Sequence, residues 1–327
     1  MDNQYYAGID LGGTSIKMGI CSPDGQIICE REQATPQGHY ENVLEAFQQM
    51  LHQLLAEAEL SPKDLAGVGV GVPALLDVEQ GNVYEIVNLG WKNVPLKAEL
   101  EKRLGLPSYV DNDANTAALG EMWQGAGKCS RHLICITVGT GIGGGLIING
   151  DIYHGALGLA GEIGHMTIRP EGGLLCNCGK PGCLETETSA TAIAYYGRKA
   201  VDEQQETRLT QTLKQQGVIT AKDVIDAARS GDVVSVKILH HVGYYLGLAL
   251  AQMSNVLNPE KIVIGGGVSK AGDFFLEPIR ENFIKYALNK VSETTDIVPA
   301  TLGNKAGWLG AAWLVHRNSR PGQNGGK

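Results

Sequence analysis

The sequence lacks both an excess of positive charge and a long apolar run. Its 327 residues include 27 Lys and Arg against 35 Asp and Glu, which gives a formal net charge of -8. Nucleic acids and anionic membranes call for basic surfaces, so this balance argues against both as main partners. No run approaches the roughly 18 apolar residues of a membrane helix, and the opening MDNQYYAGIDLGG lacks the basic and apolar regions of a secretory signal. We therefore expect a cytoplasmic protein that binds neither a membrane nor nucleic acid.

Cysteine is scarce as well, and its number, 7, is odd, which does not suit a disulfide framework. Three of the cysteines lie close together at Cys176, Cys178 and Cys183, among glycines and a proline that allow tight turns, and His165 precedes them. Zinc commonly takes three cysteines and one histidine in a closed tetrahedron. We therefore predict a structural Zn²⁺ ion held by His165, Cys176, Cys178 and Cys183. Disulfides and free buried thiols are the alternatives, although Cys176 and Cys178 are too close to pair comfortably with each other.

Glycine, by contrast, is abundant, with 44 residues, about twice the average share. Three apolar strands each lead into a glycine-rich turn, at about residues 10–14, 139–145 and 265–267. Backbone N–H groups in such turns bind anions, and glycine lets a phosphate approach closely. The first turn joins two strands, unlike the strand–loop–helix of a Walker A motif. We assign these residues to a bound nucleotide: Asp10, Gly12, Gly13, Thr14, Lys17, Thr137, Gly139, Thr140, Gly141, Gly265, Gly266 and Gly267.

Strands and helices alternate along the chain, which indicates α/β layers. Strands are predicted at 5–9, 16–21, 26–31, 65–72, 108–110, 133–137, 146–148, 262–264 and 297–302. Helices are predicted at 41–59, 95–104, 115–123, from 189, and at 220–229, 232–257, 274–288 and 306–316. The opening of strand, glycines and strand occurs twice, which predicts a duplicated unit whose second copy begins near Asp113.

A polar cluster, Asp111-Asn112-Asp113-Ala114-Asn115, precedes one of these helices. Asn and Asp are favoured at helix N-caps, so a cap explains part of the cluster. Four such residues in five positions exceed what one cap needs. We therefore expect at least one of them to have a function.

These motifs bear a resemblance to known proteins over about residues 5–316. The turns at Asp10–Thr14 and Thr137–Gly145 resemble the phosphate motifs of the actin, sugar-kinase and Hsp70 superfamily, and the 161–185 segment resembles the zinc-containing signature of the ROK family. The resemblance implies a two-lobed actin-like ATPase (ribonuclease H-like) α/β fold with a duplicated βββαβα unit and a cleft between the lobes. The small lobe would comprise 1–113 plus about 304–317, and the large lobe, with the zinc loop, 114–303. Residues 318–327 are expected to form a disordered tail.

Within this family the resemblance implies an ATP-dependent glucokinase. Asn112 and Asp113 match the family's Asn-Asp pair, in which Asp113 would be the general base for the sugar 6-hydroxyl. The positions that match the family's other sugar-binding residues are Glu162, His165 and Glu185. Mg²⁺ would lie near Asp10 and contact it through water, Gly265–Gly267 would border the adenosine, and a homodimer is expected.

Two alternatives to a glucokinase stay open at this point. The first is a ROK kinase for another hexose, such as N-acetylmannosamine, N-acetylglucosamine or fructose. The second is a sugar-sensing repressor of the same family. Such repressors carry an N-terminal helix-turn-helix domain, for which a strand that starts by about Tyr5 leaves no room.

Overall fold

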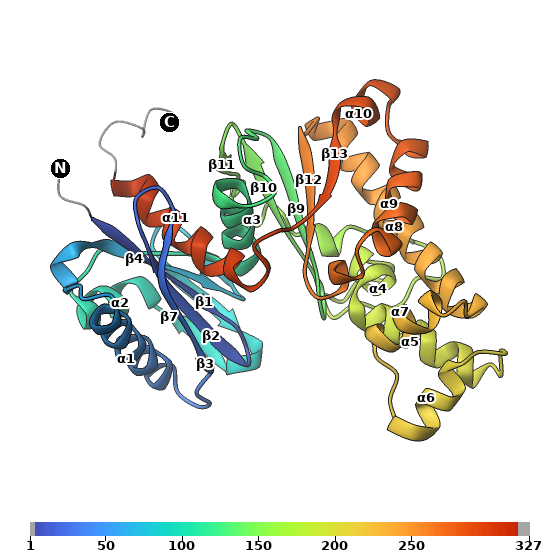
Figure 1. Cartoon of the computed structure of the whole chain (residues 1–327), viewed down its shortest axis with the longest axis horizontal. Helices are drawn as coiled ribbons and strands as arrows, with labels where there is room; N and C mark the ends of the chain where they lie inside the picture. The colour runs from blue at the N-terminus through green and yellow to red at the C-terminus, as the bar shows by residue number, and fades with distance from the viewer. Residues whose placement is uncertain (1–3, 320–327) are drawn as a thin grey trace. The chain divides into compact units, whose positions relative to one another are not determined.

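The computed structural model describes residues 4–319, and their packing divides them into two compact units (Figure 1). The first unit comprises the described residues of Met1–Arg131, Gly145–Gly161 and Leu302–Lys327. The second comprises His132–Gly144 and Glu162–Thr301. The predicted lobes divide the chain after Asp113, whereas packing keeps residues 114–131 with the first unit. The lobe bounds stay a prediction.

The first unit is built on a five-stranded sheet of order β3-β2-β1-β4-β8. The first three strands are antiparallel, whereas β4 and β8 run parallel to β1. Across the parallel strands Asp10 lies opposite Gly71, and Gly71 lies opposite Asp111. The carboxyl ends of β1, β4 and β8 therefore meet at one edge of the sheet, where ligands of α/β proteins commonly bind. The bounds are β1 Tyr5–Leu11, β2 Ser15–Cys21, β3 Ile27–Ala34, β4 Leu65–Val72 and β8 Ser108–Asn112.

A second five-stranded sheet has the order β11-β10-β9-β12-β13, which repeats the strand order of the first. The predicted duplication is thereby confirmed. The glycines at 143–145, predicted as part of a turn, instead lie inside β10, so the turn itself is limited to a few residues before Ile142. The bounds are β9 Leu133–Val138, β10 Ile142–Ile148, β11 Asp151–Ile152, β12 Lys261–Gly265 and β13 Asp296–Pro299.

Apolar periodicity predicts the longer helices of both units, whereas the short helices at 184–188, 209–216 and 289–294 were not predicted. The helices of the first unit are α1 Tyr40–Glu57, α2 Leu96–Leu104, α3 Asp113–Gln124 and α11 Ala306–Ser319. Those of the second are α4 Leu184–Thr188, α5 Ala190–Asp202, α6 Leu209–Gln216, α7 Ala221–Arg229, α8 Val233–Leu257, α9 Asp273–Tyr286 and α10 Asn289–Thr294. A small sheet of β5 Leu75–Asp77, β6 Asn82–Ile86 and β7 Trp91–Val94 was not predicted. Its strands are too short for an alternating pattern to identify them.

Helix α8 shows how local signals set the bounds of an element. The Asp232 side chain accepts a hydrogen bond from the Ser235 N–H at its start, and Asn258 ends it with a φ of 45°. The helix is long and apolar enough to cross a membrane by length and composition, with a mean hydropathy of 1.3. It nevertheless packs against α9, α7 and α4, and such a helix inside a folded unit is weak evidence for a membrane span.

The last described helix, α11, packs on β1 and β4 of the first unit. A Cβ on Gly8 would lie 1.8 Å from the Trp308 carbonyl oxygen, and a Cβ on Gly69 would lie 1.8 Å from that of Ala311. Only glycine permits this approach between sheet and helix. The helix continues through Asn318 and Ser319, so the tail predicted from residue 318 was wrong at these two residues. Residues 320–327 lie outside the described part of the chain.

Candidate active site and cysteine cluster

Asp10 lies near the end of β1, beside the first glycine turn. Its carboxylate is 3.8 Å from Lys17 Nζ on β2. Burial raises the pKa of Asp10, while the positive charge of Lys17 opposes this shift. A Cβ on Gly307, in the first turn of α11, would lie 2.6 Å from the Asp10 carboxyl carbon, so the carboxylate lies at the positive end of a helix.

The turn from Gly12 to Thr14 is held by its own backbone and by Thr35, the residue that follows β3. The Gly12 N–H donates to the Ser15 carbonyl at 2.9 Å, and the Thr35 hydroxyl donates to the Gly12 carbonyl at 2.7 Å. The Thr35 N–H donates to the Thr14 carbonyl at 3.0 Å. The turn is therefore fixed in shape, as an anion-binding turn must be.

The second unit places its two predicted nucleotide turns side by side. Thr137, near the end of β9, lies opposite Gly265 at the end of the parallel strand β12. The Gly139 N–H donates to the Gly141 carbonyl at 3.0 Å, and the Gly139 carbonyl accepts from Ala190 N–H at 2.8 Å, the first residue of α5. The turns at 139–141 and 265–267 therefore follow adjacent strands at one sheet edge.

The polar cluster at the end of β8 forms the start of α3. Asn112 is its N-cap, because its Oδ1 accepts hydrogen bonds from Ala114 N–H at 2.8 Å and Asn115 N–H at 3.3 Å. The Asn112 amide also donates to the Ala74 carbonyl at 3.3 Å. Asp113, the first residue of α3, is half-buried and accepts from Ala114 N–H at 2.9 Å. The expected cap is Asn112, and Asp113 lies where a helix favours negative charge.

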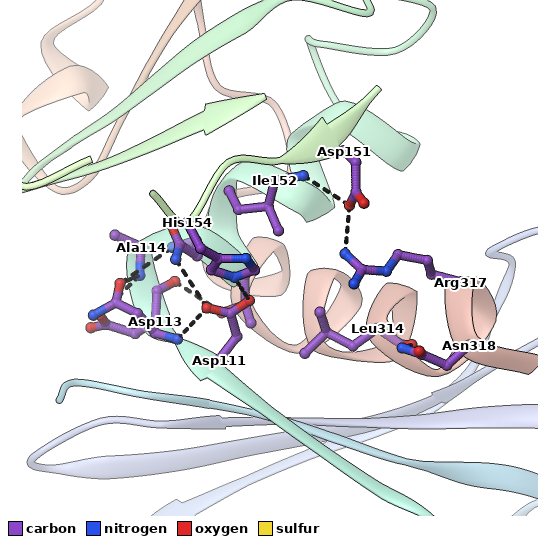
Figure 2. Close-up of polar contacts among 12 residues, drawn as sticks. Asp111, Asp113, Ala114, Asp151, Ile152, His154, Leu314, Arg317 and Asn318 are labelled. Carbon is purple, nitrogen blue, oxygen red and sulfur yellow. Dashed lines mark hydrogen bonds and ion pairs between the residues drawn. The ribbon is translucent and has the colours of Figure 1, made fainter. Parts of the chain in front are cut away.

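Asp111 has a second partner that the sequence did not identify. Its side chain is fully buried, and its Oδ2 lies 2.7 Å from His154 Nε2. Figure 2 shows this contact as a dashed line. Its Oδ1 accepts from the Asn112 N–H at 2.7 Å and from the Asn115 amide at 2.9 Å. His154 lies 43 residues away, beyond β11. No local pattern in the sequence connects it with Asp111.

The four predicted metal ligands come together in the second unit. The side-chain atoms of His165, Cys176, Cys178 and Cys183 that could bind a metal all lie within 4.8 Å of one another. Cys178 Sγ is 3.5 Å from Cys183 Sγ, and Cys176 Sγ is 3.6 Å from His165 Nδ1. In tetrahedral zinc sites with Zn–S bonds of about 2.3 Å, ligand sulfurs lie about 3.8 Å apart. The cluster therefore has the size of a Cys₃His zinc site.

All seven cysteines, which fall within residues 4–319, are free in the structure, so the disulfide alternative is not supported. Burial raises the pKa of Cys183 to about 12, whereas hydrogen bonding from the Lys180 backbone lowers the pKa of Cys178. A metal that binds here must therefore displace protons from buried thiols.

Glu185 and Glu162 lie on either side of this cluster in the sequence. Glu185, on α4, accepts the Ile142 N–H at 2.9 Å through Oε2. A Cβ on Gly141 would lie 2.2 Å from the same oxygen, so the second glycine turn and this carboxylate are in close contact. Glu162 is exposed and caps the short 3₁₀ helix Ile163–His165, where its carbonyl accepts the His165 N–H at 3.1 Å.

Comparisons with known proteins decide the family. A model of the ROK family matches residues 6–318. The chain belongs to the ROK family. It is 47% identical to a glucokinase from Halalkalibacterium halodurans over 99% of both chains, and 37% identical to one from Thermotoga maritima over 94% of this chain and 96% of that one. A crystal structure of a ROK family glucokinase from Streptomyces griseus, in complex with glucose and AMPPNP, is 34% identical with a TM-score of 0.79 over 95% of this chain and 98% of that one.

Membership of the ROK family agrees with the sheets described above. Two five-stranded sheets with corresponding strand orders are those of the predicted actin-like ATPase fold. The prediction of fold class is thereby confirmed. The predicted site residues form two groups. Asp10–Thr14, Lys17, Asn112 and Asp113 lie in the first unit, and the remaining glycine turns, Glu162, His165, Glu185 and the cysteines lie in the second.

One further buried carboxylate of this ROK protein lies two residues after Glu185. Glu187 is fully buried, and its Oε2 accepts from the Tyr196 hydroxyl at 2.6 Å and contacts His241 Nε2 at 2.8 Å and Arg169 at 3.5 Å. Burial raises the pKa of Glu187, but these hydrogen bonds and charges outweigh it and lower the pKa below its ordinary value of 4.5. Glu187 therefore joins α4 to α5 and α8.

Proposed function

We propose that this ROK protein is an ATP-dependent glucokinase that transfers the γ-phosphoryl group of ATP to the 6-hydroxyl of glucose. The observation that carries the proposal is the position of Asp113, the first residue of α3 at the ligand-binding edge of the first sheet. The similarity of the chain to glucokinases at 47% and 37% identity supports the same activity.

Asp113 is the general base in this proposal. Phosphoryl transfer depends mainly on alignment and on stabilisation of charge, so the protein must position the sugar hydroxyl and accept its proton. The N-terminus of α3 favours the ionised carboxylate, which is the form that accepts a proton. Its half-buried position leaves the carboxylate accessible to a substrate.

Glucose is bound, in this proposal, by Asn112 and Asp113 and by Glu162, His165 and Glu185. These residues offer carboxylates, an amide and an imidazole, which together can form hydrogen bonds to several hydroxyls. An analogue that lacks one hydroxyl leaves a polar group unpaired, which is costly in a buried site. This donor and acceptor set therefore supports a hexose as substrate.

The glycine turns hold the nucleotide in this proposal. The fixed turns at 12–14 and 139–141 offer backbone N–H groups to the phosphates, and Gly265–Gly267 border the adenosine. Asp10 is a carboxylate close to a phosphate turn, a donor type that suits Mg²⁺. Bound Mg²⁺ would neutralise phosphate charge during transfer. Lys17 would remain beside Asp10, because its positive charge attracts the Asp10 carboxylate.

The cysteine cluster is proposed to hold a structural Zn²⁺. His165, Cys176, Cys178 and Cys183 supply the four ligands of a closed site, and the distances between their donor atoms suit a tetrahedron. The neighbouring Glu185 then emerges from a segment whose shape the metal fixes. A homodimer in the cytoplasm is also proposed, and analytical ultracentrifugation would test the dimer.

Asp113→Asn tests the function directly. The variant should keep glucose affinity, measured by isothermal titration, but lose turnover by roughly 10²–10⁴-fold, which is the usual contribution of a general base. Turnover is measured as glucose 6-phosphate formed, with Asp64→Asn as the control, because that carboxylate only caps the short 3₁₀ helix Pro62–Asp64. Near-normal turnover of Asp113→Asn would remove this residue from its role. A kcat/KM for N-acetylmannosamine, N-acetylglucosamine or fructose well above that for glucose would overturn the choice of sugar.

A further inference from the structure

The environment of Asp111 is unusual for a residue that touches no proposed ligand. Its side chain is completely buried, and its two oxygens contact three groups from three parts of the first unit. Oδ1 binds the Asn112 backbone N–H and the Asn115 amide, so it holds the residues on both sides of Asp113. Oδ2 binds only His154 among the hydrogen bonds described above.

His154 is itself held in place at both ends of its segment. Before it, Asp151 of β11 forms an ion pair with Arg317 of α11 at 2.7 Å, which Figure 2 also shows. After it, the Ala160 N–H donates to the His154 carbonyl at 3.0 Å. The side chain is 22% exposed, so the imidazole reaches inward to Asp111 from near the surface. A carboxylate oxygen accepts hydrogen bonds, so this contact assigns the ring proton of His154 to Nε2.

We propose that Asp111 and His154 are positioning residues for the catalytic base Asp113. The inference rests on the proposed function, because it assigns meaning to the orientation of Asp113. His154 fixes Oδ2, and this prevents the Asp111 carboxylate from rotating and withdrawing Oδ1 from the Asn112 N–H. Asn112 in turn caps α3 and sets the backbone that bears Asp113. The path from imidazole to base thus passes through two hydrogen bonds, each of 2.7 Å.

The position of the pair distinguishes it from a purely structural one. A buried carboxylate needs partners wherever it lies, so its hydrogen bonds alone would indicate only stability. Here the bonded oxygens lie at the turn from β8 into α3, one residue before the sugar-binding pair. Catalysis is sensitive to such placement, since a misplacement of about 1 Å can cost on the order of 10²-fold in rate.

Substitutions of His154 test this role. His154→Leu removes the donor and should lower kcat about 10- to 100-fold, while the KM for ATP stays within about threefold because the residues proposed to bind the nucleotide remain in place. His154→Gln keeps an N–H at a similar reach and should restore kcat to within about threefold of the wild type. His154→Asn is polar but one methylene shorter, so it should behave like His154→Leu. Arg317→Gln is the control, because it releases the same segment from α11 without touching Asp111.

The outcomes separate the proposals. An unchanged kcat in His154→Leu, or equal losses of kcat in His154→Gln and His154→Asn, would refute the positioning role. Equal losses of kcat in Arg317→Gln and His154→Leu would do the same, because then loosening of the segment suffices. If His154→Leu does not fold, the comparison of Gln with Asn still decides, with thermal unfolding measured for both. Failure of the wild type to phosphorylate glucose, or near-normal turnover of Asp113→Asn, would instead reject the proposed function.

Discussion

The contact between Gly141 and Glu185 allows the proposed glucose site to be perturbed at little cost to the fold. Gly141→Ala would place a Cβ 2.2 Å from Glu185 Oε2 and 3.1 Å from the carboxyl carbon of the same side chain. Ordinary C···O contacts lie at about 3.3 Å, so the oxygen must retreat by about 1 Å. The obstacle is the end of a flexible side chain, and it can move at little cost to stability.

The displaced carboxylate determines the size of the effect. Its hydrogen bond from the Ile142 N–H, now 2.9 Å, would be lost or strongly weakened. A hydrogen bond to a charged group contributes about 1.5–3 kcal/mol. If glucose binding in the transition state loses the same orientation, kcat/KM for glucose falls about 10- to 150-fold, since each 1.36 kcal/mol is tenfold.

Coupled assays of glucose 6-phosphate formation measure this change, with glucose and ATP each varied. Gly139→Ala is the matched variant in the same turn, because a Cβ there meets nothing within 4 Å. We expect Gly141→Ala to raise the KM for glucose and Gly139→Ala to leave that KM unaltered, with any effect confined to ATP. Wild-type kcat/KM for glucose in Gly141→Ala would show that Glu185 does not contact the sugar. The same glucose defect in both variants would place the cause in the turn rather than in Glu185.

Two further predictions concern the second unit. Cys178→Ser should reduce bound zinc well below about one ion per chain and lower the melting temperature, because structural zinc contributes on the order of 10 kcal/mol to ordering its ligands. Cys129→Ser, at an exposed cysteine outside the cluster, is the control. Elemental analysis that finds no zinc in the wild type would contradict the site. Glu187→Gln should lower the free energy of unfolding by about 1–3 kcal/mol at pH 7, because it weakens the buried contact with His241. The folded-state pKa of Glu187 is lowered, so this stability is fully present above pH 4.5 and is lost as the pH falls through the folded pKa below it. Denaturant unfolding at several pH values should show the difference between wild type and variant shrinking below pH 4.5, and a constant difference would exclude this linkage.

The parts of the fold that the sequence predicted well are those with strong local signals. Helix α8 begins after the N-cap Asp232 and ends at the C-cap Asn258, and these two residues predict both of its bounds. Strand β4, Leu65–Val72, is an uninterrupted small and apolar run, and it was predicted to the residue. The β5–β7 sheet was missed because its stability comes from pairing between neighbouring strands. The sequences of such short strands do not predict this pairing.

The same distinction holds for the candidate site. The metal ligands were predicted because three of them fall within eight residues and their chemistry is specific. His154 and Glu187 were missed because each gains its role from a partner in another element, Asp111 and His241 respectively. Burial of these carboxylates is a property of the folded unit, and a lone His or Glu in a sequence is far more often an ordinary surface residue.

The return of α11 to the first unit has a consequence for how the chain matures on the ribosome. Gly8 and Gly69 are made early, but the backbone they accommodate, at Trp308 and Ala311, emerges some 240 to 300 residues later. Because a ribosome adds about 5–20 residues per second, this helix is synthesised on the order of ten seconds to a minute after the first sheet. During that interval its glycine-lined face remains open, so the part of the protein that is translated first is completed last.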